Sequence, residues 1–291
     1  MATKLQSLLA ELTAGEPRPP NHVADKTLAL RGSGIREKVV DDRKTLDGQV
    51  AIVTGGVRRI GRAMALSLAR EGATVVINAK SSRDEAEATA KEVEAAGGRA
   101  LVHLADVTNE ADVEGMVTKV IETFGHVDIL INNAAIRREV PFTQMSLAEW
   151  REITSVILEG AFLGSRAVLS HMVRAKHGRI INIGGVSAHT GAYNRAHVAT
   201  AKSGLTGMTR ALAVEFAEHG ITVNCVVPGK IGGKRSETSG HSVSLPGGGQ
   251  PLVGHDGAPE DVAEVVRMLC LPTGGFITGQ TIHVSGGLFM P

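Results

Sequence analysis

Residues 49–61 read QVAIVTGGVRRIG, a short β-branched apolar run that ends in a glycine-containing turn. Residues 62–72, RAMALSLAREG, continue with Ala and Leu at helical spacing up to Gly72. This order predicts a buried strand, a tight turn and a helix that stops at the glycine. Backbone N–H groups at such a helix start, aided by the helix dipole, favour a bound pyrophosphate. The turn is therefore a candidate anion site, although a tight strand–helix connection needs glycine in any case.

The alternation of strand and helix continues to the C-terminus. Near-continuous apolar strands separated by helices of ten or more residues indicate a parallel sheet with helices on both faces and right-handed crossovers. We expect an α/β fold with a doubly wound, Rossmann-type sheet. Further strands are predicted at ATVVINA 73–79, RALVHLA 99–105, VDILINNA 127–134, GRIINIGG 178–185, ITVNCVVPG 221–229 and TIHVSGG 281–287, and helices at 83–96, 109–124, 147–176, 195–219 and 258–270.

The composition is that of a globular protein. Of 291 residues, 43% are hydrophobic and 21% are charged, which excludes disorder or coiled coil as a description of the whole chain. A net charge of +1 gives no general attraction to nucleic acid or anionic lipid. Cys225 and Cys270 are too few for a disulfide framework or a metal site, and we expect no metal. Neither a signal-peptide pattern nor an uninterrupted apolar run of about 18 residues is present, so we expect a soluble cytoplasmic protein without a membrane partner.

The residues after the second predicted strand indicate which dinucleotide the turn would hold. An acidic side chain there would bind a ribose 2′-hydroxyl, as in NAD recognition. The chain instead supplies Lys80, Ser81 and Ser82, together with Arg58 and Arg59 in the first turn. Guanidinium groups suit phosphate geometry, so these residues predict a 2′-phosphate pocket and NADP(H) as the cofactor. The alternative is a solvated basic turn.

Residues 1–46 form a separate zone, which we predict to be an N-terminal helical extension and linker. Four leucines between residues 5 and 12 recur at helical spacing, and prolines from residue 17 end the pattern. The dinucleotide-binding domain is predicted over residues 47–291. Within it, residues 232–257 are rich in Gly and Ser at their start, and we expect a substrate lid there that a ligand orders.

A set of motifs carries a resemblance to a known family: TGGVRRIG at 54–61, Asp106-Val107, NNAA at 132–135, Lys202, Pro228-Gly229 and FITGQTIHVSGG at 276–287. Together they resemble the short-chain dehydrogenase/reductase superfamily over residues 47–290, most of all its ketoacyl carrier-protein reductase branch. The resemblance implies hydride transfer to a small-molecule substrate and a homotetramer. The predicted cofactor-binding residues are Gly55, Arg58, Arg59, Ile60, Gly61, Lys80, Ser81, Ser82, Asp106, Val107, Asn133, Ala134, Ala135, Lys202, Pro228, Gly229 and Ile231.

The resemblance also implies where parts of the cofactor would lie. Asp106 and Val107 would border the adenine, Lys202 would hold the nicotinamide ribose, and residues 228–231 would flank the nicotinamide. Arg59 stands where the family usually has glycine, as in NADPH-dependent relatives similar to pteridine reductases.

At the reaction end the family pattern is broken. Members that reduce carbonyls share a Ser, a Tyr and a Lys at fixed spacing, with an Asn on the preceding helix. The Tyr hydroxyl gives a proton to the substrate oxygen, the Ser hydroxyl positions that oxygen, and the Lys lowers the Tyr pKa. With Lys202 as the family lysine, the Tyr position falls on Val198, the Ser position on Gly185 and the Asn position on Ile157.

Three nearby side chains are candidates for a relocated acid. Tyr193 and His189 are expected in the loop before the helix that carries Lys202, and His197 lies on the helix itself. A histidine suits proton transfer at neutral pH, but each of the three also has a plain packing role. Arg137 and its neighbour Arg138 follow the NNAA run, where they would meet an anionic substrate or form part of the surface.

Three interpretations follow. In the first, the chain is an NADP(H)-dependent oxidoreductase that reduces an imine or iminium, an activated C=C bond or an unusual carbonyl without the usual acid. In the second, it is a non-catalytic nucleotide-binding homologue, a pseudoenzyme or partner subunit. In the third, it is an ordinary ketoreductase with a relocated acid.

Overall fold

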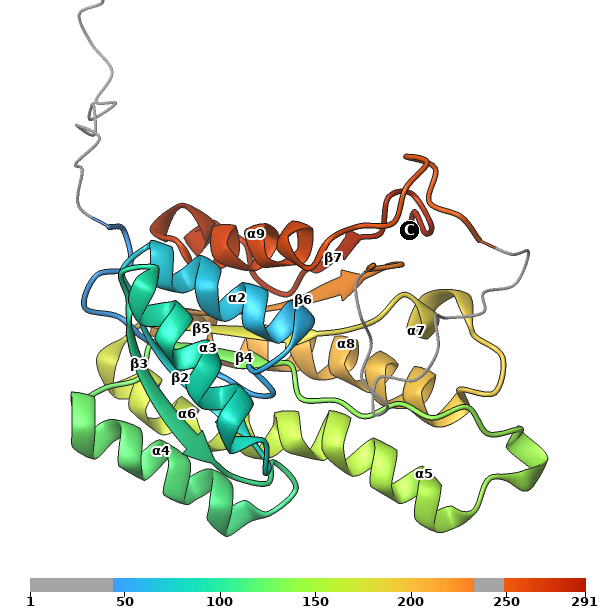
Figure 1. The fold of residues 1–291 in the computed structure, drawn as a ribbon, viewed down its shortest axis with the longest axis horizontal. Helices are drawn as coiled ribbons and strands as arrows, with labels where there is room; N and C mark the ends of the chain where they lie inside the picture. The colour runs from blue at the N-terminus through green and yellow to red at the C-terminus, as the bar shows by residue number, and fades with distance from the viewer. Residues whose placement is uncertain (1–43, 233–248) are drawn as a thin grey trace, which may run out of the picture. The chain divides into compact units, whose positions relative to one another are not determined.

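The computed structural model describes residues 44–232 and 249–291. The helix predicted within residues 1–46 and most of the lid predicted at 232–257 lie outside these ranges. The described residues form one seven-stranded parallel sheet in the order β3-β2-β1-β4-β5-β6-β7 (Figure 1). The predicted doubly wound α/β fold is therefore confirmed. The strands are β1 (Val50–Val53), β2 (Thr74–Ala79), β3 (Arg99–Leu104), β4 (Ile129–Asn132), β5 (Gly178–Ile183), β6 (Ile221–Pro228) and β7 (Thr281–Val284).

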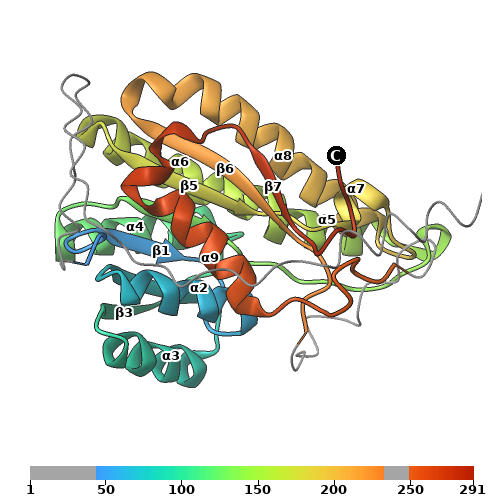
Figure 2. The ribbon, with the colours of Figure 1, turned by 90° about the horizontal axis from the view of Figure 1, so that it is seen from above.

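Helices cover both faces of this sheet. In Figures 1 and 2, α2, α3 and α9 lie on one side, and α4 and α6 lie on the other. The bounds are α2 (Arg59–Arg70), α3 (Arg83–Ala95), α4 (Glu110–Phe124), α5 (Leu147–Thr154), α6 (Gly160–Ala175), α7 (Ser187–Thr190), α8 (Ala196–Phe216) and α9 (Pro259–Cys270), with 3₁₀ turns at Phe142–Gln144, Ala217–His219 and Pro272–Phe276.

The strand side chains divide the core into two layers. Ala51 and Val53 pack into the cluster under α2 and α9, whereas Val50 and Ile52 pack into the cluster under α4 and α6. Successive strand residues point to opposite faces, so a strand buried on both faces is apolar at most of its positions. This is why the strands read as near-continuous apolar runs. Leu46, which the sequence assigned to the linker, is fully buried in the first cluster.

The predicted helix at 147–176 has a change of winding in its middle. A π-helical segment, Ser155–Glu159, separates α5 from α6. The whole segment, Leu147–Ala175, is the one helix among the described residues that is long and apolar enough to cross a membrane by length and composition. Core helices have the same composition, and buried residues of α6 such as Val168 and Met172 pack against the sheet.

The strand order places the site. The strand order reverses at the neighbouring strands β1 and β4. From β1 the chain goes on to β2 and β3 on one side of this pair, and from β4 it goes on to β5, β6 and β7 on the other side. The loops after β1 and β4 therefore leave the sheet on opposite sides and open a crevice at the carboxyl edge.

Buried amides join the sheet to α8 behind this crevice. Asn132 Nδ2 donates to Asn182 Oδ1 at 2.9 Å and to Ser165 Oγ at 3.1 Å, and Asn182 Nδ2 donates to Thr209 Oγ1 at 2.9 Å. Asn132 is 5% exposed, and Asn182 and Thr209 are fully buried. Each of these groups depends on its partner, because water does not reach it.

Replacing Asn182 with Ala is expected to lower the free energy of unfolding by about 1–3 kcal/mol, because Asn132 and Thr209 each lose a buried partner. Urea unfolding followed by circular dichroism measures this. Thr118→Ala, at an exposed position of α4, is the control and is expected to change stability by less than about 0.5 kcal/mol. Equal stability of Asn182→Ala and the control would contradict the role given to these hydrogen bonds.

Candidate active site

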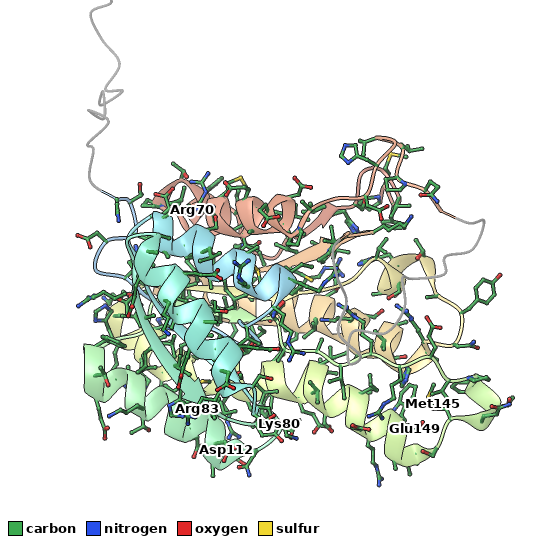
Figure 3. The ribbon with its side chains drawn as sticks, viewed as in Figure 1. Arg70, Lys80, Arg83, Asp112, Met145 and Glu149 are labelled. Carbon is green, nitrogen blue, oxygen red and sulfur yellow. The ribbon has the colours of Figure 1, made fainter. Side chains whose placement is uncertain are left out.

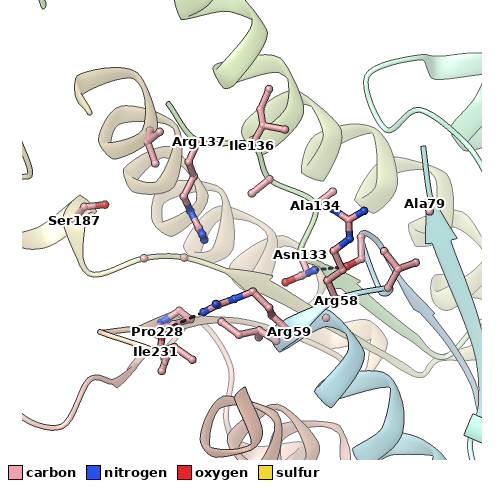
Figure 4. Close-up of a pocket in the computed structure, with 18 of the residues that line it drawn as sticks. Arg58, Arg59, Ala79, Asn133, Ala134, Ile136, Arg137, Ser187, Pro228 and Ile231 are labelled. Atoms are coloured by element: carbon pink, nitrogen blue, oxygen red, sulfur yellow. Dashed lines mark hydrogen bonds between the residues drawn. The ribbon is translucent and has the colours of Figure 1, made fainter. Parts of the chain in front are cut away.

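A cavity of about 450 Å³ lies at the carboxyl edge of the sheet (Figure 4). This size suits a small-molecule or cofactor site. It is built by the loops after β1, β2, β4, β5 and β6 and by the start of α8. The lining residues are Gly55, Val57, Arg58, Arg59, Ile60, Gly61, Ala79, Lys80, Ser81, Ser82, Asn133, Ala134, Ala135, Ile136, Arg137, Gly184, Gly185, Val186, Ser187, Arg195, Val198, Pro228, Gly229 and Ile231.

The turn after β1 brings backbone close to the cavity. Helix α2 begins at Arg59, so its first N–H groups lie at the turn. A Cβ on Gly61 would overlap the Gly55 carbonyl oxygen and lie 2.7 Å from Asn133 Nδ2, so only glycine fits there. Arg59 has φ +47°, a left-handed conformation that costs a non-glycine residue roughly 1–2 kcal/mol. A strained conformation at a cavity indicates a role for the side chain.

The same turn is tied to the loop after β4. Asn133 Nδ2 donates to the carbonyl oxygens of Thr54 and Gly55, both at 2.9 Å. The hydroxyl oxygen of Thr54 accepts hydrogen bonds from the backbone N–H groups of Asn133 and Ala134, at 3.0 and 3.1 Å. These four bonds fix the two loops on either side of the crevice relative to one another.

Basic side chains gather where β2 ends. Arg58 forms an ion pair with Glu85, and its Nη2 donates to Ser82 Oγ at 3.3 Å. Lys80 Nζ lies 2.7 Å from Asp106 Oδ2, and its side chain is 75% exposed. Figure 3 shows Lys80 at the end of β2, close to the start of α3. The Lys80 ammonium and the Thr108 hydrogen bonds hold the pKa of Asp106 below its usual value in spite of partial burial.

Arg59 reaches the opposite wall of the cavity. Its Nη2 donates to the carbonyl oxygens of Ile231 and Gly232, both at 3.0 Å (Figure 4). Partial burial lowers its pKa. The Arg59 guanidinium thus lies between the turn after β1 and the segment after β6.

These features fit a phosphorylated dinucleotide. At Gly61 there is no room for a side chain, so only backbone lies at this point of the turn, beside the N-terminus of α2. Arg58, Lys80 and Ser82 line the wall beyond the end of β2. No Asp or Glu lines the cavity among residues 44–232 and 249–291. The predicted cofactor-binding residues line the cavity except for three: Asp106 pairs with Lys80 beside it, Val107 is buried, and Lys202 lies below the surface.

Among the residues that the structure describes, the cavity wall around Gly185, Ser187 and Val198, called here the reaction end, offers no phenol or carboxylate. Val198 lines it at the position where the family pattern has Tyr, and Gly185 lines it at the Ser position. Ile157, at the Asn position, is 2% exposed and lies in the π-helical segment, packed with Ile153 and Ala161. The described lining contains one hydroxyl at this end, that of Ser187 on α7.

Lys202 is buried beneath this wall. It is 2% exposed, and its Nζ donates to the Ile183 carbonyl oxygen at the end of β5. Burial lowers the pKa of Lys202 to about 7, and the positive charge of Arg137 contributes in the same direction. The ammonium therefore loses its proton far more readily than an exposed lysine does.

The relocated-acid candidates lie elsewhere in the described chain. Tyr193 is 65% exposed and does not line the cavity. His197 is fully buried and does not line it either, and burial lowers its pKa. His189 packs on His283 and Phe289, with ring centroids 4.5 and 5.2 Å away. The structure thus brings none of the three to the cavity wall.

Two arginines enter the reaction end of the cavity. Arg137 comes from the loop after β4, as the sequence indicated. Arg195, just before α8, was missed, because no periodicity or motif marks it; it is 4% exposed and pairs with Glu139 at 2.6 Å. Arg138, in contrast, is exposed, pairs with Glu152 and lies outside the lining.

The buried lysine predicts a specific pH dependence of stability. Between pH 7 and 10.5, the unfolded chain binds a proton on Lys202 that the native chain lacks. Native stability therefore rises with pH in this window, by at most about 1.4 kcal/mol per unit, and the burial penalty is fully present below it. Relative to Lys202→Met, the wild type should gain about 1–2 kcal/mol between about pH 7.5 and about pH 9 in urea unfolding.

Lys91→Met, at an exposed position of α3, is the control for general pH effects and is expected to follow the wild type. A constant difference between wild type and Lys202→Met across the window would show that Lys202 keeps its proton in the native state.

Comparisons with known proteins agree with this fold. A family model described as Enoyl-(Acyl carrier protein) reductase matches residues 55–289. A protein named (2S)-[(R)-hydroxy(phenyl)methyl]succinyl-CoA dehydrogenase subunit BbsD, from Thauera aromatica, is 41% identical over 248 residues, which cover 83% of this chain and 97% of that protein.

Two further relatives are 3-oxoacyl-[acyl-carrier-protein] reductases. The one from Synechocystis sp. is 39% identical over 84% of this chain and 98% of its own. The one from Aquifex aeolicus is 37% identical, with the same coverage. The chain therefore belongs to the short-chain dehydrogenase/reductase superfamily of oxidoreductases, in its ketoacyl carrier-protein reductase-like branch.

Proposed function

We propose that this chain is an NADP(H)-dependent oxidoreductase that transfers hydride without the usual Ser, Tyr and Asn of its family. The observation that carries the proposal is one cavity with a complete phosphate-binding turn at one end and Val198 and Gly185 at the other. The substrate is an imine or iminium, an activated C=C bond or an unusual carbonyl. The protein acts in the cytoplasm as a homo-oligomer, a tetramer by resemblance to its family.

Charge at the end of β2 supports the preference for the phosphorylated cofactor. Arg58 and Lys80 line the cavity there, beside the hydroxyls of Ser81 and Ser82. Their partners Glu85 and Asp106 do not line it. A 2′-phosphate would accept charge-assisted hydrogen bonds from the two cations, whereas a ribose hydroxyl gains less from them.

The bound cofactor supplies a hydride, and the residues of the chain determine what else the reaction needs. Val198 has no proton to give, so a ketone would receive hydride at carbon without an acid at its oxygen. An iminium already carries the charge that an acid would supply, and a conjugated C=C bond takes its proton at carbon. Lys202, which the family resemblance assigns to the nicotinamide ribose, lies buried beneath the cavity wall and donates to the Ile183 carbonyl oxygen.

A double variant tests the cofactor preference. Arg58→Gln with Lys80→Gln should raise the Kd for NADPH about 10–100-fold and leave that for NADH within about threefold, because charge-assisted bonds to the 2′-phosphate are lost. Isothermal titration calorimetry measures both affinities.

Arg62→Gln is the matched control, since Arg62 lies on the same helix as Arg59, pairs with Glu92 and is outside the lining. An equal loss of NADH and NADPH affinity would contradict 2′-phosphate recognition. Failure of the wild type to bind either dinucleotide would remove the proposed function altogether.

Restoring the family hydroxyls tests the missing acid. A Cβ on Gly185 would meet no atom closer than 3.9 Å, so serine fits there, and Val198 shares a helix face with Lys202. Gly185→Ser with Val198→Tyr should oxidise NADPH with ketones about 10²-fold or more faster than the wild type.

Gly185→Ser with Val198→Phe is the control, because it matches the ring but lacks the phenol. The wild type is assayed beside it with ketones, cyclic imines and enones. Turnover of an imine or enone supports the proposal, and silence with all three, while NADPH binds, refutes it. Equal ketone rates in the Tyr and Phe variants would show that the missing hydroxyl is not what limits the wild type.

A binding subunit is the second candidate function. Two observations favour it: the ammonium of Lys202 is engaged by the Ile183 carbonyl oxygen, and the relative from Thauera aromatica is named as a subunit of a dehydrogenase. A binding subunit would bind NADPH but turn over none of the substrates, which distinguishes it from the proposed oxidoreductase. A relocated acid, the third interpretation, would need Tyr193 or His197 at the cavity, and neither lines it.

A further inference from the structure

One hydroxyl lies in the part of the cavity wall where the family resemblance places a serine. Ser187 begins α7, lines the cavity and is 7% exposed. Figure 4 shows its side chain at the reaction end, directed toward the side where Arg137 lies. Among residues 44–232 and 249–291, its hydroxyl has no hydrogen-bond partner. A nearly buried hydroxyl without a partner is costly, so a ligand that bonds to it gains stability.

The other hydroxyls around α7 are already engaged. Thr190, at the end of this helix, donates from its Oγ1 to the carbonyl oxygen of Gly191 at 2.8 Å. Ser203 on α8 donates from its Oγ to the carbonyl oxygen of Ala188 at 3.1 Å. Neither of them lines the cavity. These two hydroxyls hold the local backbone, whereas that of Ser187 is left for the cavity.

The backbone that carries Ser187 is fixed on both sides. Val186, just before it, is 3% exposed and donates its N–H to the carbonyl oxygen of Pro228 at 3.1 Å. Ala188, just after it, accepts the hydrogen bond from Ser203. A side chain on such a backbone needs little rearrangement to meet a ligand, which is what a substrate-positioning group requires.

The Ser187 hydroxyl lies near the point where a serine at the family position would stand. The resemblance assigns that position to Gly185, and a Cβ there would lie 4.0 Å from Ser187 Oγ and 3.9 Å from Lys202 Cγ. A serine at residue 185 would carry its hydroxyl one bond from this Cβ. Because a hydroxyl reaches an acceptor over about 2.5–3.0 Å, hydroxyls at the two points can bond to the same substrate atom.

We propose that Ser187 is a catalytic residue that forms a hydrogen bond with the polar atom of the substrate bond that accepts the hydride. This inference rests on the proposed function and adds to it a side chain that contacts the substrate. A serine hydroxyl both donates and accepts, so it can donate to an imine nitrogen or a carbonyl oxygen and accept from an iminium N–H group. Ser187 keeps its own proton, so it positions the substrate and does not replace the missing acid.

The other polar side chains at this end are already in use. Arg195 forms an ion pair of 2.6 Å, and Arg137 also has an interaction of its own. Lys202 donates to the Ile183 carbonyl oxygen and does not line the cavity. A substrate would have to share or replace these contacts, whereas Ser187 has none to replace within the described chain.

The experiment compares the wild type with Ser187→Ala and with the control Ser170→Ala, at an exposed position of α6. Each protein is assayed with NADPH and with ketones, cyclic imines and enones. On the substrate that the wild type reduces fastest, Ser187→Ala should lower kcat by about 10–10²-fold and leave KM within about threefold, because the hydrogen bond holds the accepting bond in the reacting geometry. Ser170→Ala should match the wild type.

Returning the hydroxyl to the family position separates positioning from packing. Gly185→Ser combined with Ser187→Ala should bring kcat back to within about fivefold of the wild type, because the added hydroxyl can bond to the same substrate atom. A Cβ at residue 185 meets no atom closer than 3.9 Å, so the serine fits. Gly185→Ala combined with Ser187→Ala is the matched control, which adds the same Cβ without a hydroxyl and should stay as slow as Ser187→Ala.

A second measurement does not depend on turnover. The carbonyl oxygen of 2-piperidone accepts a hydrogen bond, and this amide does not take a hydride from NADPH. Calorimetry with NADPH-loaded protein should give a Kd for 2-piperidone about 3–10-fold higher for Ser187→Ala than for the wild type, as expected for the loss of one hydrogen bond. Thermal melting and NADPH titration show whether each variant is folded and binds the cofactor.

The outcomes separate this inference from the proposed function. NADPH binding without turnover of any substrate refutes the proposed function, and this inference with it. Turnover that Ser187→Ala leaves unchanged refutes the inference alone, as does recovery by Gly185→Ala equal to that by Gly185→Ser. No difference in 2-piperidone binding between the wild type and Ser187→Ala also counts against Ser187. A loss of kcat that only Gly185→Ser restores, with weaker 2-piperidone binding, supports the inference.

Discussion

The hydrogen bonds between Thr54 and the loop after β4 are the interaction on which the site depends. Parallel strands end at one edge, but their loops diverge at the point where strand order reverses, so the crevice has two walls with separate origins. Asn133 and the Thr54 hydroxyl close that gap with four bonds of 2.9–3.1 Å. The turn after β1 and the loop that carries Arg137 are thereby held in one frame.

The fold could be predicted from the sequence because strands and helices leave their pattern in neighbouring residues of the chain. A strand buried on both faces is mostly apolar, and a helix that packs on it has apolar residues at helical spacing. The strands β1 to β7 could therefore be predicted from apolar runs, and α2 from its periodicity. The turn could be predicted because it requires glycine at residue 61, where a Cβ would overlap the Gly55 carbonyl oxygen. The π-helical segment at Ser155–Glu159 could not be predicted from the sequence, because one turn of π-helix differs from an α-helix only by one residue in its hydrogen-bond spacing.

The site could be predicted from the sequence only for residues that directly follow the end of a strand. Arg195 and Glu139 are distant in sequence, and only the tertiary fold pairs the buried Arg195 with the more exposed Glu139. The pairing of Lys80 with Asp106 likewise joins the ends of β2 and β3. Tyr193 shows the reverse: proximity in sequence to Lys202 indicated a relocated acid, but the loop before α8 leaves it 65% exposed. Spacing along a helix predicts neighbours, whereas spacing along a loop does not.

If Val198 stands at the family's Tyr position, as we propose, the contribution of the buried Lys202 differs from that of the family lysine. Beside a phenol, a lysine ammonium is useful because its charge favours the phenolate and eases proton release. With Val198 in that position, the same charge has no acid to act on, and burial together with Arg137 lowers the Lys202 pKa to about 7. Among the described residues, the cavity wall at Val198 therefore presents no phenol on which this charge could act, in keeping with proposed substrates that need no acid at oxygen.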